Sequence, residues 1–409
     1  MKYDSPKIYV ALPAMNEMEN IAAFMDCIDA QDYREIETFI CVNQPDDWWD
    51  NPEKINICEN NLQTLEYLVS LSSTNLHVID RCSKGNGWKG KNYGVGQARK
   101  VVMDEIAKIA DNDDIIVCLD ADTHFNLNYF SSIVRNFQKH PKAVALSVPY
   151  YHPLNENPDA NRQILHYEIY MRYYALNLWR IESPYSFTAV GSAMVLPIWA
   201  YKAMGGITPH KSGEDFYFMQ KLRKYGEVLT WNNEKVYPAA RFSDRVFFGT
   251  GPAMIKGSTG DWGSYPIYPF ELFDKVGGFY DFFPRLFVKD IETPLDDFIS
   301  EKFGNKNIWK PLRENSKTKE QFVKACHQKF DALRVLQYLK WENSKNPKRD
   351  ESVFYGYMKE FHISELKNLS FDLAEMDFEK SPIKQLDELR DLLVRIEEGI
   401  QINSISGIV

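Results

Sequence analysis

An uninterrupted apolar run that ends in two carboxylates constrains this chain most. Residues 115–119 read Ile-Ile-Val-Cys-Leu, and Asp120-Ala121-Asp122 follows directly. A run of this length, rich in β-branched residues, predicts a strand buried on both faces, as in a parallel sheet. Ligands of open α/β sheets bind beyond the carboxyl ends of the strands, which is where both aspartates are expected. On an extended chain the two carboxylates project to the same side, which predicts a site for Mg²⁺ or Mn²⁺ shared with a substrate phosphate.

The triplet alone leaves a second interpretation open. Asp-x-Asp is short and common, and aspartates in a segment such as Asp-Ala-Asp-Thr also stabilise turns. The rest of the chain must therefore decide between a cation site and a turn.

Strand and helix signals alternate through the first part of the chain. Besides the run at 115–119, apolar runs predict strands at residues 7–13, 38–43, 76–80 and 143–149. Apolar spacings of three and four predict helices at residues 17–30 and 128–140. This alternation predicts an α/β fold with a mostly parallel, right-handed sheet flanked by helices. Residues 44–61, which carry Trp48-Trp49 and two prolines, are interpreted as a surface excursion.

A dinucleotide-binding domain is the obvious alternative for such a sheet. Its Gly-x-Gly-x-x-Gly fingerprint should directly follow the first strand, but residues 13–17 read Pro-Ala-Met-Asn-Glu. Gly85 and Gly87 follow the third strand instead. We interpret them as part of a flexible loop that leads into a helix ending near Ala110.

Later segments contribute further polar residues. A long aromatic helix is expected at about 161–180, and a strand at 188–196 has a central Gly191, where the backbone could approach a ligand closely. Glu214 and Asp215 open the next helix, where the helix dipole favours carboxylates. Residues 249–251, Gly-Thr-Gly, predict a loop.

From about Asp274 onward the only signal is helical amphipathicity. We therefore expect a first domain at residues 1–273 and a helical C-terminal extension at residues 274–409. The extension is expected to pack on the first domain or to meet a partner, and to carry no catalytic group.

Composition narrows the class of protein. The net charge of -9 gives no support to non-specific nucleic-acid binding. No run of about 18 apolar residues is present, so no transmembrane segment is expected. The six cysteines form no Cys-x-x-Cys pair, which suggests reduced thiols in a cytoplasmic protein, free or peripheral to the inner face of the membrane.

Four motifs in this order resemble those of family 2 glycosyltransferases with the GT-A fold. They are Pro13 through Asn16-Glu17, Asp120-Ala121-Asp122, Gly191-Ser192-Ala193 and Gly213-Glu214-Asp215. The resemblance covers roughly Lys7 to Met254, and the Lys91 and Arg241 segments look like those of a bacterial subgroup. It implies a Rossmann-like GT-A domain and a hexosyltransferase-type enzyme that moves a sugar from a nucleoside-diphosphate-sugar to an acceptor hydroxyl.

The resemblance also implies a role for each matching residue. Asp120 and Asp122 would hold Mg²⁺ or Mn²⁺. Asp215 would be the general base of an inverting transfer, and Glu214 would orient the acceptor or the base. The donor would be contacted by Pro13, Asn16, Glu17, Asn43, Lys91, Arg99, Asp120, Arg241 and Arg245.

Some of these roles stay open. The family usually has Asp where Asn43 stands, so the base of the nucleotide is not identified. His210 is the only nearby candidate for a third metal ligand, and Arg241, Ser243 and Arg245 could instead hold the diphosphate directly. For Lys91 and the arginines, a solvated or salt-bridged structural role is the competing interpretation.

Two other classes of protein are also compatible with the chain. One is a retaining GT-A transferase or a sugar nucleotidyltransferase, although the latter should have a basic glycine-rich signature after its first strand. The other is a non-catalytic carbohydrate-binding protein on the same fold, which the presence of Asp120, Asp122 and Asp215 disfavours. The acceptor, a carbohydrate or another hydroxyl compound, and the oligomeric state are not predicted.

Overall fold

The structure, a computed structural model, describes residues 3, 5–91, 93–243 and 249–406, with side chains through residue 402. The chain divides into two compact units. Unit 1 comprises residues 1–164 and 187–260, and unit 2 comprises residues 165–186 and 261–409. The division after residue 260 lies near the domain boundary expected at residue 273, and it differs in assigning residues 165–186 to the second unit.

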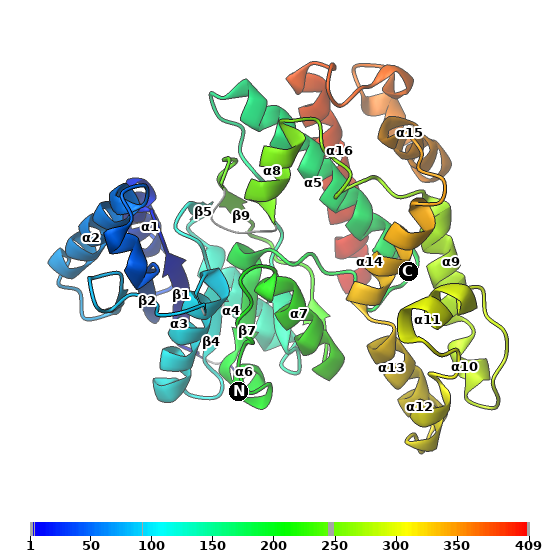
Figure 1. The fold of residues 1–409 in the computed structure, drawn as a ribbon, viewed down its shortest axis with the longest axis horizontal. Helices are drawn as coiled ribbons and strands as arrows, with labels where there is room; N and C mark the ends of the chain where they lie inside the picture. Colours follow the sequence, from blue (N-terminus) through cyan, green and yellow to red (C-terminus); the bar gives the residue numbers. More distant parts are fainter. Residues whose placement is uncertain (1–2, 4, 92, 244–248, 407–409) are drawn as a thin grey trace. The chain divides into compact units, whose positions relative to one another are not determined.

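A seven-stranded sheet forms the centre of unit 1 (Figure 1). In spatial order its strands are β3 (Leu76–Arg81), β2 (Ile36–Asn43), β1 (Ile8–Ala14), β4 (Ile115–Cys118), β7 (Met194–Pro197), β6 (Ala145–Ser147) and β8 (Val228–Leu229). The first four are mutually parallel, whereas β7 runs antiparallel to both of its neighbours. The predicted mostly parallel sheet is confirmed, and the run at 115–118 is its fully buried central strand.

Helices flank this sheet. Those of unit 1 are α1 (Met18–Asp29), α2 (Ile55–Ser70), α3 (Val95–Ile109), α4 (Tyr129–Lys139), α6 (Ile198–Ala203), α7 (Glu214–Tyr225) and α8 (Thr250–Gly257), with the first turns of α5 (Pro158–Arg180). Helix α3 packs on β1 and β2 through Val102, Met103 and Ile106, which are fully buried and recur at spacings of one and three. The first turns of α3 carry Arg99, whose guanidinium reaches Asp120 just beyond the end of β4.

A second, two-stranded sheet positions the Asp-x-Asp motif. Strand β5 (Thr123–Phe125) pairs antiparallel with β9 (Val236–Pro238), with Thr123 opposite Pro238. The backbone N–H of Ala239 donates to the carbonyl oxygen of Asp122 at 3.1 Å. This pairing brings the segment after β9, which contains Arg241, next to the motif.

Three local predictions are wrong. Residues 44–61 are not a simple surface excursion, because they contain a 3₁₀ turn (Asp46–Asp50) and the start of α2. Of the strand expected at 188–196, only the part from Met194 onward belongs to a strand, β7, and Gly191–Ala193 forms a 3₁₀ turn. The loop expected at 249–251 ends at once, since α8 begins at Thr250.

Every regular element described in unit 2 is helical. It contains the later part of α5 together with α9 (Phe270–Tyr280), α10 (Phe283–Leu286), α11 (Asp296–Phe303), α12 (Lys310–Glu314), α13 (Lys319–Lys329), α14 (Ala332–Asn343), α15 (Asp350–Phe361) and α16 (Ile383–Ser406). An ion pair joins α5 to α16, since the buried Arg172 of α5 pairs with Glu397 of α16 as well as with Glu168 of its own helix. No helix in the described part of the chain is both long and apolar enough to cross a membrane.

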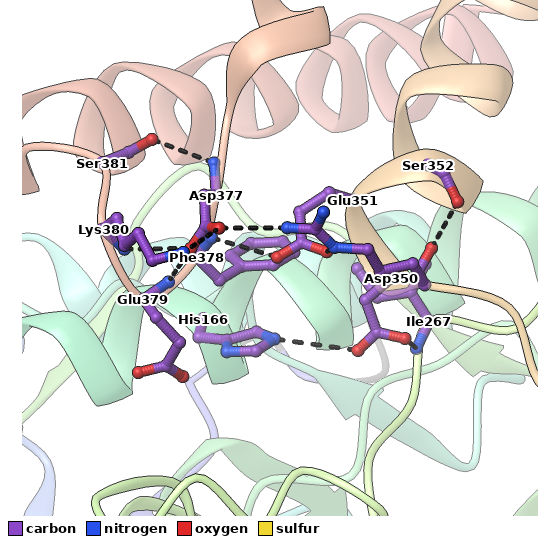
Figure 2. Close-up of polar contacts among 11 residues, drawn as sticks. His166, Ile267, Asp350, Glu351, Ser352, Asp377, Phe378, Glu379, Lys380 and Ser381 are labelled. Atoms are coloured by element: carbon purple, nitrogen blue, oxygen red, sulfur yellow. Dashed lines mark hydrogen bonds and ion pairs between the residues drawn. The ribbon is translucent and has the colours of Figure 1, made fainter.

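Unit 2 contains a polar cluster with a buried histidine, His166, at its centre (Figure 2). The ring of His166 stacks on Phe378 with centroids 3.9 Å apart and lies 3.8 Å from the ring of Trp262. Its Nε2 is 3.9 Å from Oδ2 of Asp350, whose Oδ1 accepts the backbone N–H of Ile267 at 3.0 Å. Burial lowers the pKa of His166 to about 3 and raises the pKa of Asp350 to about 6. The histidine is therefore a neutral packing residue at pH 7.

Candidate functional site

The turn after β1 places the first candidate residues. Pro13 lies within β1, and Asn16 follows it with a left-handed φ of 59°. Asparagine adopts this conformation more readily than most residues. The backbone N–H of Asn16 donates to Oδ1 of Asn61 at 2.7 Å. This turn leads directly to Glu17, whose side chain is buried.

Asp120 and Asp122 lie in a turn rather than on the extended segment that the sequence predicted. Strand β4 ends at Cys118, and the backbone N–H of Thr123 donates to the carbonyl oxygen of Asp120 at 3.1 Å. The chain must turn here because pairing with β9 begins immediately after Asp122. The side chain of Asp120 is 38% exposed and that of Asp122 is 13% exposed.

Each aspartate of the motif is paired with its own arginine. Nη2 of Arg99 lies 2.9 Å from Oδ1 of Asp120, and Nε of Arg241 lies 2.6 Å from Oδ2 of Asp122. Arg241 also donates through Nη2 to Oε1 of Glu17 at 2.5 Å. The positive guanidinium groups thus offset the repulsion among carboxylates gathered at one edge of the sheet.

Arg99 also contacts the start of α7. Its Nη1 donates to Oε1 of Glu214 at 2.5 Å, and the side chains of Arg99 and Glu214 are 1% and 4% exposed. Charged groups this deeply buried need a charged or hydrogen-bonding partner. Arg99 therefore joins the Asp-x-Asp motif to the helix that carries the predicted base. Its expected contact with the nucleotide stays a prediction.

Helix α7 begins after Gly213, whose φ of 74° lies in the left-handed region. Oδ1 of Asp215 accepts the backbone N–H of Phe216 at 2.7 Å. Burial raises the pKa of Asp215, against the opposing effects of Arg99 and the Phe216 N–H. Burial also raises the pKa of Glu214, again opposed by Arg99. Burial thus opposes the ionised form of Asp215 that a helix start favours.

Gly191 is close to a side chain of this site rather than to an open ligand position. A Cβ atom on Gly191 would lie 2.8 Å from Nη1 and 2.9 Å from Nη2 of Arg99. A Cβ atom on Gly96, in the first turn of α3, would lie 2.2 Å from the carbonyl oxygen of His210. Gly191 thus makes room for the buried guanidinium of Arg99, and no contact described at Gly191 indicates that it touches a ligand.

Asn43 ends β2 at the edge where a nucleoside contact was predicted. Its amide is used within the protein, because Nδ2 donates to the carbonyl oxygen of Ala14 at 2.9 Å and Oδ1 accepts Nε1–H of Trp88 at 3.0 Å. The observed role is to hold the buried Trp88 ring against the strand ends. A contact between Asn43 and the nucleoside stays a prediction.

The glycine-rich loop after β3, which was interpreted as flexible, is hydrogen-bonded to Asp80 and to Asp46, whose Oδ1 accepts the Gly85 N–H at 2.7 Å. Asp80 accepts the backbone N–H groups of Cys82 and Ser83, each at 2.9 Å, and the Nδ2–H of Asn86 at 2.8 Å. Burial would raise the pKa of Asp80, but these hydrogen bonds outweigh it and lower the pKa to about 2. Asp80 is not among the predicted residues, although it lies near the end of a strand, which is the same signal that singled out Asp120.

The remaining predicted residues are less closely tied to this cluster. Lys91 is exposed, and the ring of His210 lies 4.7 Å from the ring of Tyr217. No contact that we describe joins His210 to the aspartates of the motif. Arg245 lies outside the described residues.

The donor set of the motif fits a hard divalent cation. Carboxylate oxygens are the protein ligands that Mg²⁺ prefers, and Mg²⁺ is usually bound by one or two carboxylates together with substrate phosphates and water. Asp120 and Asp122 can supply these two carboxylates. Within the described residues, no group of three or more His, Cys, Asp or Glu side chains is arranged to hold a metal.

Comparison with known proteins identifies part of the chain. Residues 115–266 match the family model described as glycosyl transferase family group 2. This confirms the resemblance over the segment that carries three of the four motifs, from the Asp-x-Asp motif to Glu214-Asp215. No curated protein matches the chain.

Three solved structures illustrate the proteins whose fold is similar to that of this chain. Staphylococcus aureus TarS 1-349 in complex with UDP-GlcNAc has a TM-score of 0.41 at 15% identity, covering 96% of this chain and 92% of that one. The mannosyltransferase PcManGT from Pyrobaculum calidifontis in complex with GDP-Man and Mn²⁺ has a TM-score of 0.37 at 11% identity, covering 98% of this chain and 87% of that one. Glucosyl-3-phosphoglycerate synthase from Mycobacterium tuberculosis has a TM-score of 0.34 at 11% identity, covering 63% of this chain and 80% of that one. Similarities this distant carry no inference about the substrate of this chain.

Proposed function

We propose, from the match of residues 115–266 to the family model of group 2 glycosyltransferases, that the protein transfers a sugar from a nucleoside-diphosphate-sugar to an acceptor hydroxyl with inversion at the anomeric carbon. The observation that carries the proposal is the linked cluster of acidic residues in unit 1. Arg99 joins Asp120 to Glu214, and Arg241 joins Asp122 to Glu17. The donor-side and acceptor-side motifs of such an enzyme thus share one edge of the sheet.

The donor would be held by the groups on the Asp-x-Asp side. A divalent metal on Asp120 and Asp122, when bound, supplies a Lewis acid that offsets the charge of the diphosphate leaving group. The guanidinium of Arg241, which is about one-third exposed, lies between Asp122 and Glu17 and suits contact with phosphate oxygens. Contacts of Pro13, Asn16 and Lys91 with the nucleotide are proposed on the sequence resemblance alone.

The proton would be taken on the α7 side. The acceptor oxygen attacks the anomeric carbon while its proton passes to the carboxylate of Asp215. The bond from that carbon to the diphosphate oxygen breaks, and its electron pair leaves with the nucleotide. The Phe216 N–H and the helix start hold the Asp215 carboxylate in one orientation, which lowers the entropic cost of the encounter.

One screen tests this function. The purified chain is incubated with UDP-GlcNAc, UDP-glucose or GDP-mannose, with Mn²⁺ or with EDTA, and release of nucleoside diphosphate is followed. We expect release from at least one donor with Mn²⁺ and its loss in EDTA. Absence of release from all donors under both conditions would contradict the proposal, and a product with retained configuration would contradict inversion.

The base is tested on the responsive donor. Asp215→Asn preserves the acceptor of the Phe216 N–H and should lower the rate by about 10²–10⁴ while donor affinity changes little. Asp47→Asn, at an exposed residue of the 3₁₀ turn in the same unit, is the matched control. If Asp215→Asn and Asp47→Asn turned over equally fast, Asp215 would not be the base.

A further inference from the structure

We propose that Arg99 is a positioning residue that sets the placement of the Asp-x-Asp motif relative to the base helix, and that Gly191 is the residue whose missing side chain allows this. The guanidinium is buried and uses its two terminal nitrogens on different motifs, Asp120 at 2.9 Å and Glu214 at 2.5 Å. Asp120 lies 21 residues and Glu214 lies 115 residues away in the sequence. No backbone hydrogen bond that we describe joins these two segments directly.

The shape of the guanidinium explains why one residue can do this. Arg presents a rigid planar fork, so two carboxylates bound to its two Nη atoms are held at a fixed separation. A lysine ammonium is a point charge on a flexible stem and fixes no such separation. The partner groups are also unequal in exposure, since Glu214 is buried while Asp120 is 38% exposed. Arg99 therefore ties the partly exposed Asp120 to the buried Glu214.

Two glycines create the space for this arrangement. A Cβ atom on Gly191 would lie within 3.2 Å of three guanidinium atoms of Arg99, and a Cβ atom on Gly96 would lie 3.2 Å from Cβ of Glu214. Gly96 allows α3 to approach the segment before α7. Gly191, which has no Cβ atom, leaves room for the guanidinium group of Arg99. Neither glycine has a left-handed φ, so close approach rather than backbone conformation explains the residue type.

Gly191→Ala is the variant that isolates this role. The new methyl group meets the end of a long side chain rather than backbone, so the guanidinium must shift while the main chain need not. The charge, the two carboxylates and every residue that would touch substrate are retained. Gly278→Ala, in α9, is the matched control, because a Cβ atom there has no neighbour within 4 Å.

The measurement is turnover of the nucleotide sugar identified by the donor screen, with kcat and donor KM determined separately. The inference rests on the proposed function, and the wild-type protein separates the two, since a wild type without turnover contradicts the function itself. With an active wild type, we expect Gly191→Ala to lower kcat by about 10–100-fold, because misplacement by about 1 Å is enough for such losses. Donor KM should change by less than about threefold, and Gly278→Ala should match the wild type.

Two outcomes would overturn the positioning role. One is a Gly191→Ala protein whose kcat equals that of Gly278→Ala. The other is a proportional loss of activity and of folded protein, with kcat per folded molecule unchanged, which is the result for a purely structural residue. Arg99→Lys is a second test of the proposal, because lysine keeps the positive charge but lacks the planar guanidinium that binds two carboxylates at once. It should reproduce the loss in kcat, and full activity in Arg99→Lys would likewise contradict the proposal.

Discussion

Replacing Arg99 by Leu should destabilise unit 1 strongly, and the loss should depend on pH. The substitution leaves Glu214, 3% exposed, without the guanidinium that lies 2.5 Å from its carboxylate. Removing one partner of a buried pair costs about 3–5 kcal/mol, because the remaining charge is buried and uncompensated. Asp120 contributes little to this loss, since water can replace Arg99 at a side chain that is more than one-third exposed.

The pH dependence follows from Glu214. Burial already raises the pKa of this carboxyl in the folded protein, and Arg99 is the strongest opposing influence. Without Arg99 the pKa of the folded state rises further, whereas the unfolded chain titrates near 4.3. Below that pH both states are protonated and the penalty is absent. It grows as the pH rises toward the folded-state pKa, by about 1.36 kcal/mol per unit of pKa difference.

Hydrogen exchange at β1 and β4 measures this loss in unit 1 itself. Both strands are buried in the sheet, so exchange of their amides reports global opening of the unit. We expect the opening free energy of Arg99→Leu to fall by about 3–5 kcal/mol at pH 8 and by about 1–3 kcal/mol less at pH 5.5. The double variant Arg99→Leu/Glu214→Leu should recover most of the loss at both pH values.

The reasoning would be refuted by either of two results. A loss below about 1 kcal/mol at pH 8 would mean that the pair behaves like an exposed salt bridge. A loss of the same size at both pH values would mean that the cost lies in packing around Arg99 rather than in the uncompensated Glu214 charge.

Three further predictions concern Asp80, Asp350 and Asp215. Asp80→Ala should lower the stability of unit 1 by about 2 kcal/mol, because three donors of the glycine-rich loop lose their acceptor; thermal unfolding beside the exposed control Asp47→Ala measures it. Asp350→Asn should remove a pH dependence of unit 2: its pKa of about 6 means that stability is lost as the pH rises through 6, by at most about 3 kcal/mol, and urea titrations at pH 5 and 7 compare the two proteins. The rate of sugar transfer should fall on the acid side at a pH above the ordinary Asp value of about 4, because burial raises the pKa of Asp215, and a pH–rate profile shows it.

The strands of the sheet could be predicted from the sequence because the buried ones are visible as short apolar segments. Central strands of a parallel sheet are buried on both faces, so β1 and β4 appear as unbroken apolar runs and β2 contains the apolar run 39–42, which can be recognised without knowledge of the rest of the fold. Helix α2 was missed for the opposite reason. Its buried positions include Asn61 and Thr64, so it lacks a continuous apolar stripe. A helix whose inward face is partly polar gives no periodic signal.

The acidic residues of the candidate site were predicted from the sequence, but the ion pairs that join them were not. Asp120, Asp122, Glu214 and Glu17 stood out because each follows a strand or opens a helix. The pairing of Arg99 with Asp120 and Glu214 depends on how α3 docks on the sheet, which no local pattern encodes. The meaning of Gly191 was missed for the same reason, since the neighbour that requires a glycine lies 92 positions earlier in the chain.

The charge balance of the cluster links these observations to metal dependence. Five carboxyl groups, those of Glu17, Asp120, Asp122, Glu214 and Asp215, gather with two arginines. The cluster carries three negative charges when all five are ionised, and two when Glu214, whose pKa burial raises to about 7, is protonated. A nucleoside diphosphate group adds at least two more, and like charges at this range repel. The two arginines are enough to keep the carboxylates together without substrate, but not to admit a diphosphate beside them. Binding of a nucleoside diphosphate should therefore require Mg²⁺ or Mn²⁺, whereas folding should not. Calorimetry with UDP and GDP, with Mn²⁺ and with EDTA, tests the first half, and melting curves in the same two buffers test the second. Tight nucleotide binding in EDTA would show that Arg241 and its neighbours alone offset the added charge.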